Sequence, residues 1–180
     1  ALLLLAGSVS LIGGTEPLPV APAGKPDIVS VRRLTQEQYR RSIAVIFGDD
    51  IKISAHLEPD PRREGLVAIG VAQASVTASG FEQYDAAARE IAEQITDRSH
   101  RDMLIGCGPA KGDTSGTACI RGFISRTGHL LYRRPLQAGE IEHLTDIATQ
   151  AIADKHDFHG GLAVALASML ESPAFLFRVE

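Results

Sequence analysis

The chain has 180 residues, 44% of them hydrophobic and 22% charged, which is the composition of an ordinary globular protein. Its 22 acidic and 18 basic residues give a net charge of −4 and argue against nucleic acid or an anionic membrane surface as a partner. Two cysteines are too few to form a structural zinc site on their own.

The amino-terminal segment has the character of an export signal. Residues 1–12 are uncharged and mostly apolar, and they are followed by Gly13 and Gly14. A bilayer span takes about 20 residues, so this run is too short to cross, but it fits the apolar region of a secretory signal peptide. No Met and no basic residue precede it, so we interpret residues 1–14 as a truncated signal peptide. The alternative is a buried helix. Residues 15–27 are rich in proline and predict an extended linker.

Residues 28–105 are expected to form a first helical module. Thr35 and Gln38 have the spacing of a capping box, which predicts a helix start, and Gly48 predicts its end. Apolar residues recur at helical spacing after this start: Tyr39, Ile43, Ile46 and Phe47.

A second helix is predicted with Ser79 as its cap and Glu82 as the capping-box partner, closing at residues 97–100. Its expected inner face is Phe81, Tyr84, Ala88, Ile91 and Ile95. Between the two helices, residues 65–72 are small and apolar, and periodicity does not distinguish a short strand from buried coil there.

Cys107 and Cys119 bracket a glycine-rich loop that has no periodicity. The order of its residues does not match a phosphate-binding loop, because Lys111 precedes Gly112 and Asp113 follows. In an exported protein the simplest interpretation is a disulfide; the alternative is two buried free thiols. The chain has no Cys-x-x-Cys-His motif, so we expect no cofactor and no covalently attached haem within it.

Residues 106–180 are expected to form a second helical module that continues beyond the end of the chain. Helices are predicted up to Tyr132, over 138–153, and over 158–171 with Asp157 as the cap. Their expected inner faces are Ile120, Phe123, Ile124, Thr127 and Leu131; Ile141, Leu144, Ala148, Ala151 and Ile152; and Phe158, Leu162, Leu166, Met169 and Leu170. Gly122 and Gly128 could allow close packing, and the apolar tail after Pro173 is expected to pack against further sequence.

The predicted fold is therefore all-α, a bundle of about five helices with one irregular apolar insert and a disulfide-closed loop. Candidate functional residues are few. Arg32 and Arg33 could form an anion site with their neighbours, but a charge run without a phosphate-cradling loop is usually a solvated surface. His156 and His159 are weak metal candidates, because the same spacing is common in a polar helix cap. Glu58, Asp60 and Glu64 could bind calcium but lack EF-hand spacing.

Three stretches together resemble a known family. The motif RRLTQEQY starts at Arg32, the motif LYRRPL starts at Leu131, and the motif LASMLESPAFLFRVE starts at Leu166. They are similar to the exported domains of unknown function that accompany cytochrome c domains in planctomycete surface proteins, here in a form without haem. The family carries a Thr or Ser helix cap where this chain has Gln137, which puts the start of the helix at 138 in question.

The resemblance implies a helical, extracytoplasmic protein of several modules, and it adds Arg133 and Arg134 to the candidate residues. We expect a structural or interaction module, located in the periplasm or at the cell surface, without a stable membrane span. Its partners would be downstream modules of the same polypeptide or a periplasmic protein. The alternative is the amino-terminal part of a periplasmic redox-linked enzyme whose active site lies in those downstream modules.

Overall fold

The first and last elements of the described chain pair with each other. The computed structural model describes residues 31–62, 64–67, 75–109 and 116–179, so the predicted signal peptide and linker lie outside it. Strand β1 (Val31–Arg33) runs antiparallel to β2 (Phe177–Val179), with Arg32 opposite Arg178. The Leu34 amide continues the ladder by donating to the Leu176 carbonyl at 2.7 Å. The prediction of an all-α fold is confirmed apart from this small sheet.

The described residues contain five helices of three turns or more, as expected, and two helices of a single turn. The long helices are α1 (Gln36–Phe47), α3 (Ala78–Thr96), α5 (Thr117–Tyr132), α6 (Ala138–Lys155) and α7 (Phe158–Leu170). The short ones are α4 (Arg101–Leu104) and α8 (Pro173–Leu176).

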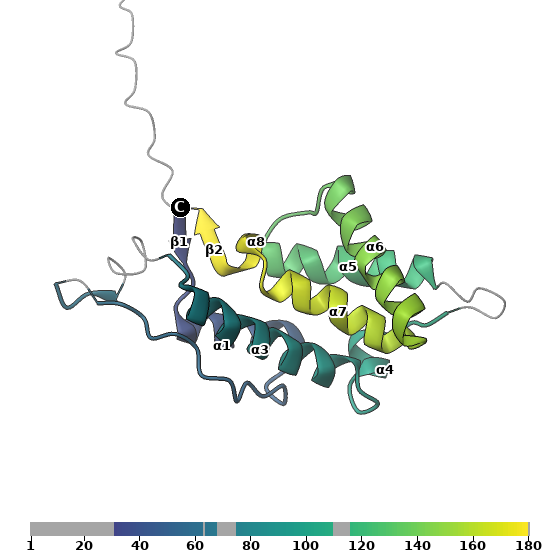
Figure 1. The fold of residues 1–180 in the computed structure, drawn as a ribbon, viewed down its shortest axis with the longest axis horizontal. Helices are drawn as coiled ribbons and strands as arrows, with labels where there is room; N and C mark the ends of the chain where they lie inside the picture. Colours follow the sequence, from purple (N-terminus) through teal and green to yellow (C-terminus); the bar gives the residue numbers. More distant parts are fainter. Residues whose placement is uncertain (1–30, 63, 68–74, 110–115, 180) are drawn as a thin grey trace, which may run out of the picture.

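Helix α7 lies at the centre of the bundle. It packs along α3 on one side and along α6 and α5 on the other (Figure 1). This position matches its sequence, because α7 is the most apolar of the long helices and buries residues on most of its circumference: Gly161, Leu162, Ala165, Leu166, Ala167, Met169 and Leu170.

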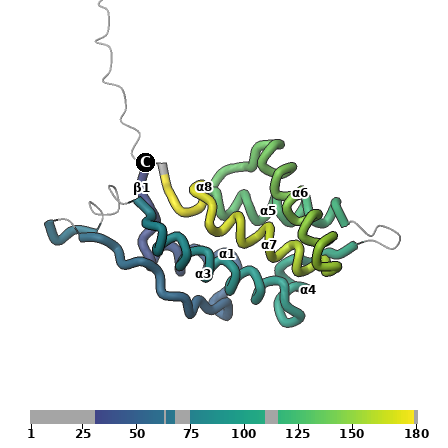
Figure 2. Tube along the Cα trace, viewed as in Figure 1, coloured from purple at the N-terminus to yellow at the C-terminus, as the bar shows by residue number. Residues whose placement is uncertain are grey.

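One hydrophobic core contains residues from both predicted modules. Tyr39 of α1, Ile91 of α3, Phe123 of α5 and Leu166 of α7 are all fully buried in it. The chain path brings β1 and β2 to the same end of the molecule (Figure 2). The predicted boundary between a first module at 28–105 and a second module at 106–180 stays a prediction.

Most predicted helix ends are confirmed. Thr35 and Gln38 form the expected capping box, Gly48 follows α1, and Asp157 caps α7 by accepting from the His159 amide. At α6, Gln137 takes the place of the usual Thr or Ser cap and forms a capping box with Glu140. The helix therefore starts where it was predicted.

The start of the second helix was predicted wrongly. Thr77, not Ser79, caps α3; its hydroxyl accepts from the Gly80 amide and also donates to Glu58 from a distant loop. The buried stripe runs back from Tyr84 through Gly80, so Phe81 lies on another side of the helix and is 49% exposed. Neither the loop contact nor this register is visible in the local sequence.

Close packing was predicted at two glycines of α5, and burial was predicted for the apolar tail after Pro173. Gly128 does allow close packing, because a Cβ there would collide with Leu136 and lie 3.0 Å from Met169, whereas a Cβ at Gly122 would meet only Arg126 of its own helix. In the apolar tail, Phe175 and Leu176 are buried in the core of this chain, and packing of the tail against further sequence stays a prediction. The insert at 65–72 lies largely outside the described residues, and Leu66 is exposed.

Candidate functional site

Arg33 is a buried cation in β1. Its side chain is 1% exposed, and its guanidinium lies 3.2 Å from Glu58 Oε2 and 3.6 Å from Asp60 Oδ1. A buried charge is stable only when it is paired in this way. Arg33 therefore ties β1 to the loop between α1 and α3, and it is not part of a solvated face.

The two carboxylates that face Arg33 have structural partners of their own. Glu58 accepts a hydrogen bond from the Thr77 hydroxyl at 3.0 Å, and Asp60 accepts from the Gln36 amide in the first turn of α1 at 3.0 Å. These contacts leave Glu58 and Asp60 engaged with Arg33 and two helix starts, so the calcium hypothesis gains no support from them.

Arg32 lies on the other face of β1, because side chains alternate along a strand. It stands directly opposite Arg178 of β2 in the register of the sheet, and both side chains are half-buried. Arg178 was not among the predicted site residues. Its position beside Arg32 depends on the pairing of the two ends of the chain, which no local motif indicates.

Arg133 holds the carboxyl-terminal segment in place. The residue ends α5 with φ 57°, and its guanidinium donates to the carbonyls of Phe175 and Phe177, both at 3.0 Å. It also lies 6.0 Å from the centre of the Phe175 ring. Burial, with a smaller effect of the nearby Arg178, lowers the pKa of Arg133.

Arg134 has a different, more local role. Its guanidinium forms two bonds to the Glu140 carboxylate, at 2.8 and 2.7 Å, and Glu140 also accepts from the Gln137 amide. The hydrogen bonds from Arg134 are the main reason why the pKa of Glu140 falls to about 2. Arg134 thus reinforces the capping box at the start of α6.

Three of these arginines line one cavity. Arg133, Arg134 and Arg178 surround a space of about 740 Å³ beside the sheet, whereas Arg32 and Arg33 line another of about 410 Å³ together with Arg178. The structure therefore brings all four predicted arginines close to the β1–β2 sheet. The guanidiniums of Arg33, Arg133 and Arg134 are bonded within the fold.

The two histidines that were candidates for a metal site lie at the ends of different helices. His156 ends α6, and His159 lies in the first turn of α7 with Nδ1 3.4 Å from Arg101 Nη1. Burial and the charge of Arg101 lower the pKa of His159. Within the described ranges, no group of three or more His, Cys, Asp or Glu side chains could hold a metal ion.

Ser99, His100 and Asp50 lie in hydrogen-bond contact, which at first suggests a hydrolase triad. His100 Nε2 is 2.9 Å from Asp50 Oδ2, and Nδ1 is 2.9 Å from the Gln94 carbonyl and 2.8 Å from Ser99 Oγ. Both ring nitrogens therefore face an oxygen that can only accept, so both must donate. In this protonated form His100 has no free lone pair to take the proton of Ser99, so the contacts do not fit a hydrolase triad.

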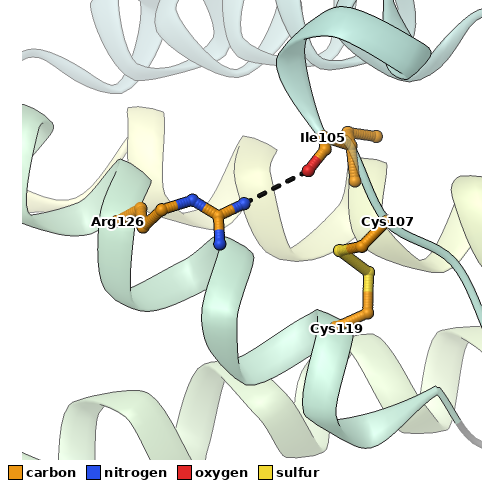
Figure 3. The surroundings of a disulfide bond; sticks show 4 residues. All are labelled: Ile105, Cys107, Cys119 and Arg126. Carbon is orange, nitrogen blue, oxygen red and sulfur yellow. Dashed lines mark hydrogen bonds between the residues drawn. A yellow bond between two sulfur atoms is a disulfide. The ribbon is translucent and has the colours of Figure 1, made fainter.

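The predicted disulfide is present. Cys107 and Cys119 are joined, with their Cα atoms 5.7 Å apart (Figure 3). Cys107 is exposed after α4, whereas Cys119 is 9% exposed in the first turn of α5. Beside the bond, Arg126 of α5 donates to the Ile105 carbonyl at 3.1 Å. The disulfide and Arg126 together connect α4 to α5.

Comparison with protein families gives two matches. Residues 32–97 match "PSD3: Protein of unknown function (DUF1587)" and residues 119–180 match "PSD5: Protein of unknown function (DUF1595)". The chain therefore carries two planctomycete-type domains of unknown function, as the three motifs indicated. Searches of curated proteins and of solved structures found no match.

Proposed function

We propose that this chain is a structural or interaction module of a larger extracytoplasmic protein and has no catalytic chemistry of its own. The observation that carries the proposal is the use of the signature arginines. Arg33 and Arg133 belong to different matched domains, and both bind groups that hold the two ends of the chain in place. Arginines with internal partners of this kind are not available to a substrate.

The disulfide supports the location, because such bonds persist in oxidising compartments and are rare in the cytosol. None of the helices in the described part of the chain is long and apolar enough to cross a membrane. A disulfide-linked helical body with two fused domains is suited to carry, or to dock against, further modules of the same polypeptide.

The test uses the complete gene product, expressed with its natural leader in a Gram-negative host. We expect it in the periplasm, with no thiol that reacts with a maleimide reagent until the unfolded protein is reduced. The separately produced downstream region should bind the 180-residue chain in a purified two-component assay. Cytoplasmic location with two reactive thiols, or no binding of the downstream region, would contradict the proposal.

A further inference from the structure

A groove of about 470 Å³ opens between α3 and α7, which lie side by side in the bundle (Figure 1). Its lining includes the small apolar side chains Ala92, Ala163, Val164 and Ala167. Arg101 and His159 also line it and contact each other. Ligand sites commonly combine a volume of about 300–1,000 Å³, an apolar lining and a few converging polar groups.

The contact between Arg101 and His159 has an unusual consequence. A guanidinium can only donate, so His159 Nδ1 accepts across the 3.4 Å separation and the ring is neutral. The pKa of His159 is lowered by burial and by Arg101. An anion that replaced this contact would favour protonation of His159 and would then receive charge-assisted hydrogen bonds from both side chains.

Two acidic residues of the groove, Asp97 and Asp157, are hydrogen-bonded to groups other than Arg101. Asp97 accepts from the amide and hydroxyl of Ser99, and Asp157 accepts from the His159 amide. The nearest ion pair of Arg101 is with Asp102, at 3.9 Å, and that carboxylate is 95% exposed.

Charges farther along the groove are mixed. Glu93 lines it, and so does Arg89, which is bonded to Asp85. Two exposed cations, Arg98 and Lys155, add positive charge to the lining. The lining as a whole therefore carries four cations, Arg89, Arg98, Arg101 and Lys155, against three carboxylates, Glu93, Asp97 and Asp157.

We propose that this groove binds a small organic carboxylate, with the carboxylate against Arg101 and His159, where it replaces their mutual contact, and the apolar body on the alanine side chains. The apolar lining favours an organic anion over inorganic phosphate. Arg101 comes from the segment between the two matched domains, so the site exists only when the two domains are packed together. The inference does not rest on the proposed structural role, and either can fail without the other.

Benzoate is a suitable probe, because it combines a carboxylate with a compact apolar ring. In a titration of the full 180-residue chain followed by NMR, saturable shifts are expected for the His159 ring and the methyl groups of Ala163 and Ala167. Bound benzoate should also raise the pKa of His159. Benzamide, which is neutral and has nearly the same shape, and inorganic phosphate, which lacks an apolar body, should each bind at least about tenfold more weakly.

Two pairs of variants locate the site. Arg101→Gln should weaken benzoate about tenfold, whereas Arg121→Gln, at an exposed arginine of α5, should leave it unchanged. Ala163→Leu should fill the groove and abolish the shifts, whereas Ala153→Leu, at an exposed position of α6, should not.

If Ala163→Leu does not fold, the partly exposed Arg101→Gln pair decides the question. Wild-type protein without saturable shifts at the groove, or Arg101→Gln binding benzoate as well as wild type, would overturn the proposal.

Discussion

Arg33 shows how a single residue can hold together segments that are far apart in sequence. Two neighbouring arginines, Arg32 and Arg33, indicate a charged surface in the sequence. In the structure, however, the side chain of Arg33 is buried beside the carboxylates of Glu58 and Asp60. Burying a guanidinium costs free energy that only good pairing offsets. The contribution of Arg33 to stability can therefore be measured by removing its charge from this cluster.

Arg33→Gln should lower the free energy of unfolding by about 3 kcal/mol, because two partly buried carboxylates lose their counter-charge. Urea denaturation monitored by circular dichroism measures the change. Arg41→Gln is the matched control on the exposed face of α1 and should cost less than about 0.5 kcal/mol. Equal effects of the two substitutions would show that the Arg33 cluster contributes no stability.

His100 connects the end of α3 to the loop that follows α1. Burial by itself would lower the pKa of His100, but the hydrogen bonds to Asp50 and the Gln94 carbonyl, with the charges of Asp50 and Asp97, outweigh it. The pKa is therefore raised above its ordinary value of 6.5. A raised pKa means that the folded state binds this proton more tightly than the unfolded state does.

The stability that His100 adds should therefore be complete at pH values below about 6.5 and should disappear as the pH rises through its folded-state pKa. The measurement is the difference in free energy of unfolding between wild type and His100→Asn across pH 5 to 9. The exposed His143→Asn of α6 is the control for the substitution itself and should cost less than about 0.5 kcal/mol. A difference that grows with pH would contradict the assigned contacts.

At the scale of elements, the caps of two helices were predicted correctly, whereas Phe81 in the first turn of α3 was assigned to the wrong face. Capping at Thr35 and Asp157 depends on residues within one turn, and both predictions are confirmed. Thr77 caps α3 through a local bond from the Gly80 amide, and its hydroxyl also donates to Glu58, a contact made across the fold.

The disulfide is the element-scale feature with the clearest energetic prediction. Replacing it by Cys107→Ser and Cys119→Ala should lower the free energy of unfolding by about 3 kcal/mol, because the unfolded chain is freed from a closed loop of about 12 residues. Serine suits the exposed position, and alanine avoids burying a hydroxyl in the core.

Urea denaturation with and without dithiothreitol checks this value. Reduced wild type should resemble the double variant, and dithiothreitol should have no effect on the variant itself. A loss below about 1 kcal/mol on reduction would show that the bond adds little to the fold.

At the scale of the whole molecule, the two ends of the described chain contact each other. The ring of Phe175 lies 5.2 Å from that of Tyr39, and Arg133 donates to the backbone carbonyls of Phe175 and Phe177. Because α7 also packs against α3, the two matched domains share one core. We expect them to unfold in one cooperative transition.

Phe175→Ala should therefore destabilise the entire fold by about 3–5 kcal/mol, since it leaves a cavity between the two domains. Phe81→Ala is the matched control, because that ring is 49% exposed, and it should cost much less. Thermal unfolding followed by calorimetry should show one transition in both variants, shifted to lower temperature mainly for Phe175→Ala. Two separate transitions in wild type would contradict a shared core.

Sequence alone determined the helical class, the approximate positions of the five long helices and the resemblance to two domains of unknown function, and it favoured a disulfide between the two cysteines. These features depend on periodicity, caps and motifs, which act within a few residues. The tertiary structure alone decided that the two ends of the described chain form a sheet, that Arg33 is buried, that Arg178 lies opposite Arg32, and that Arg101 contacts His159 beside a groove. Each of these depends on contacts between segments far apart in the chain, and local pattern carries no information about which distant surfaces will meet.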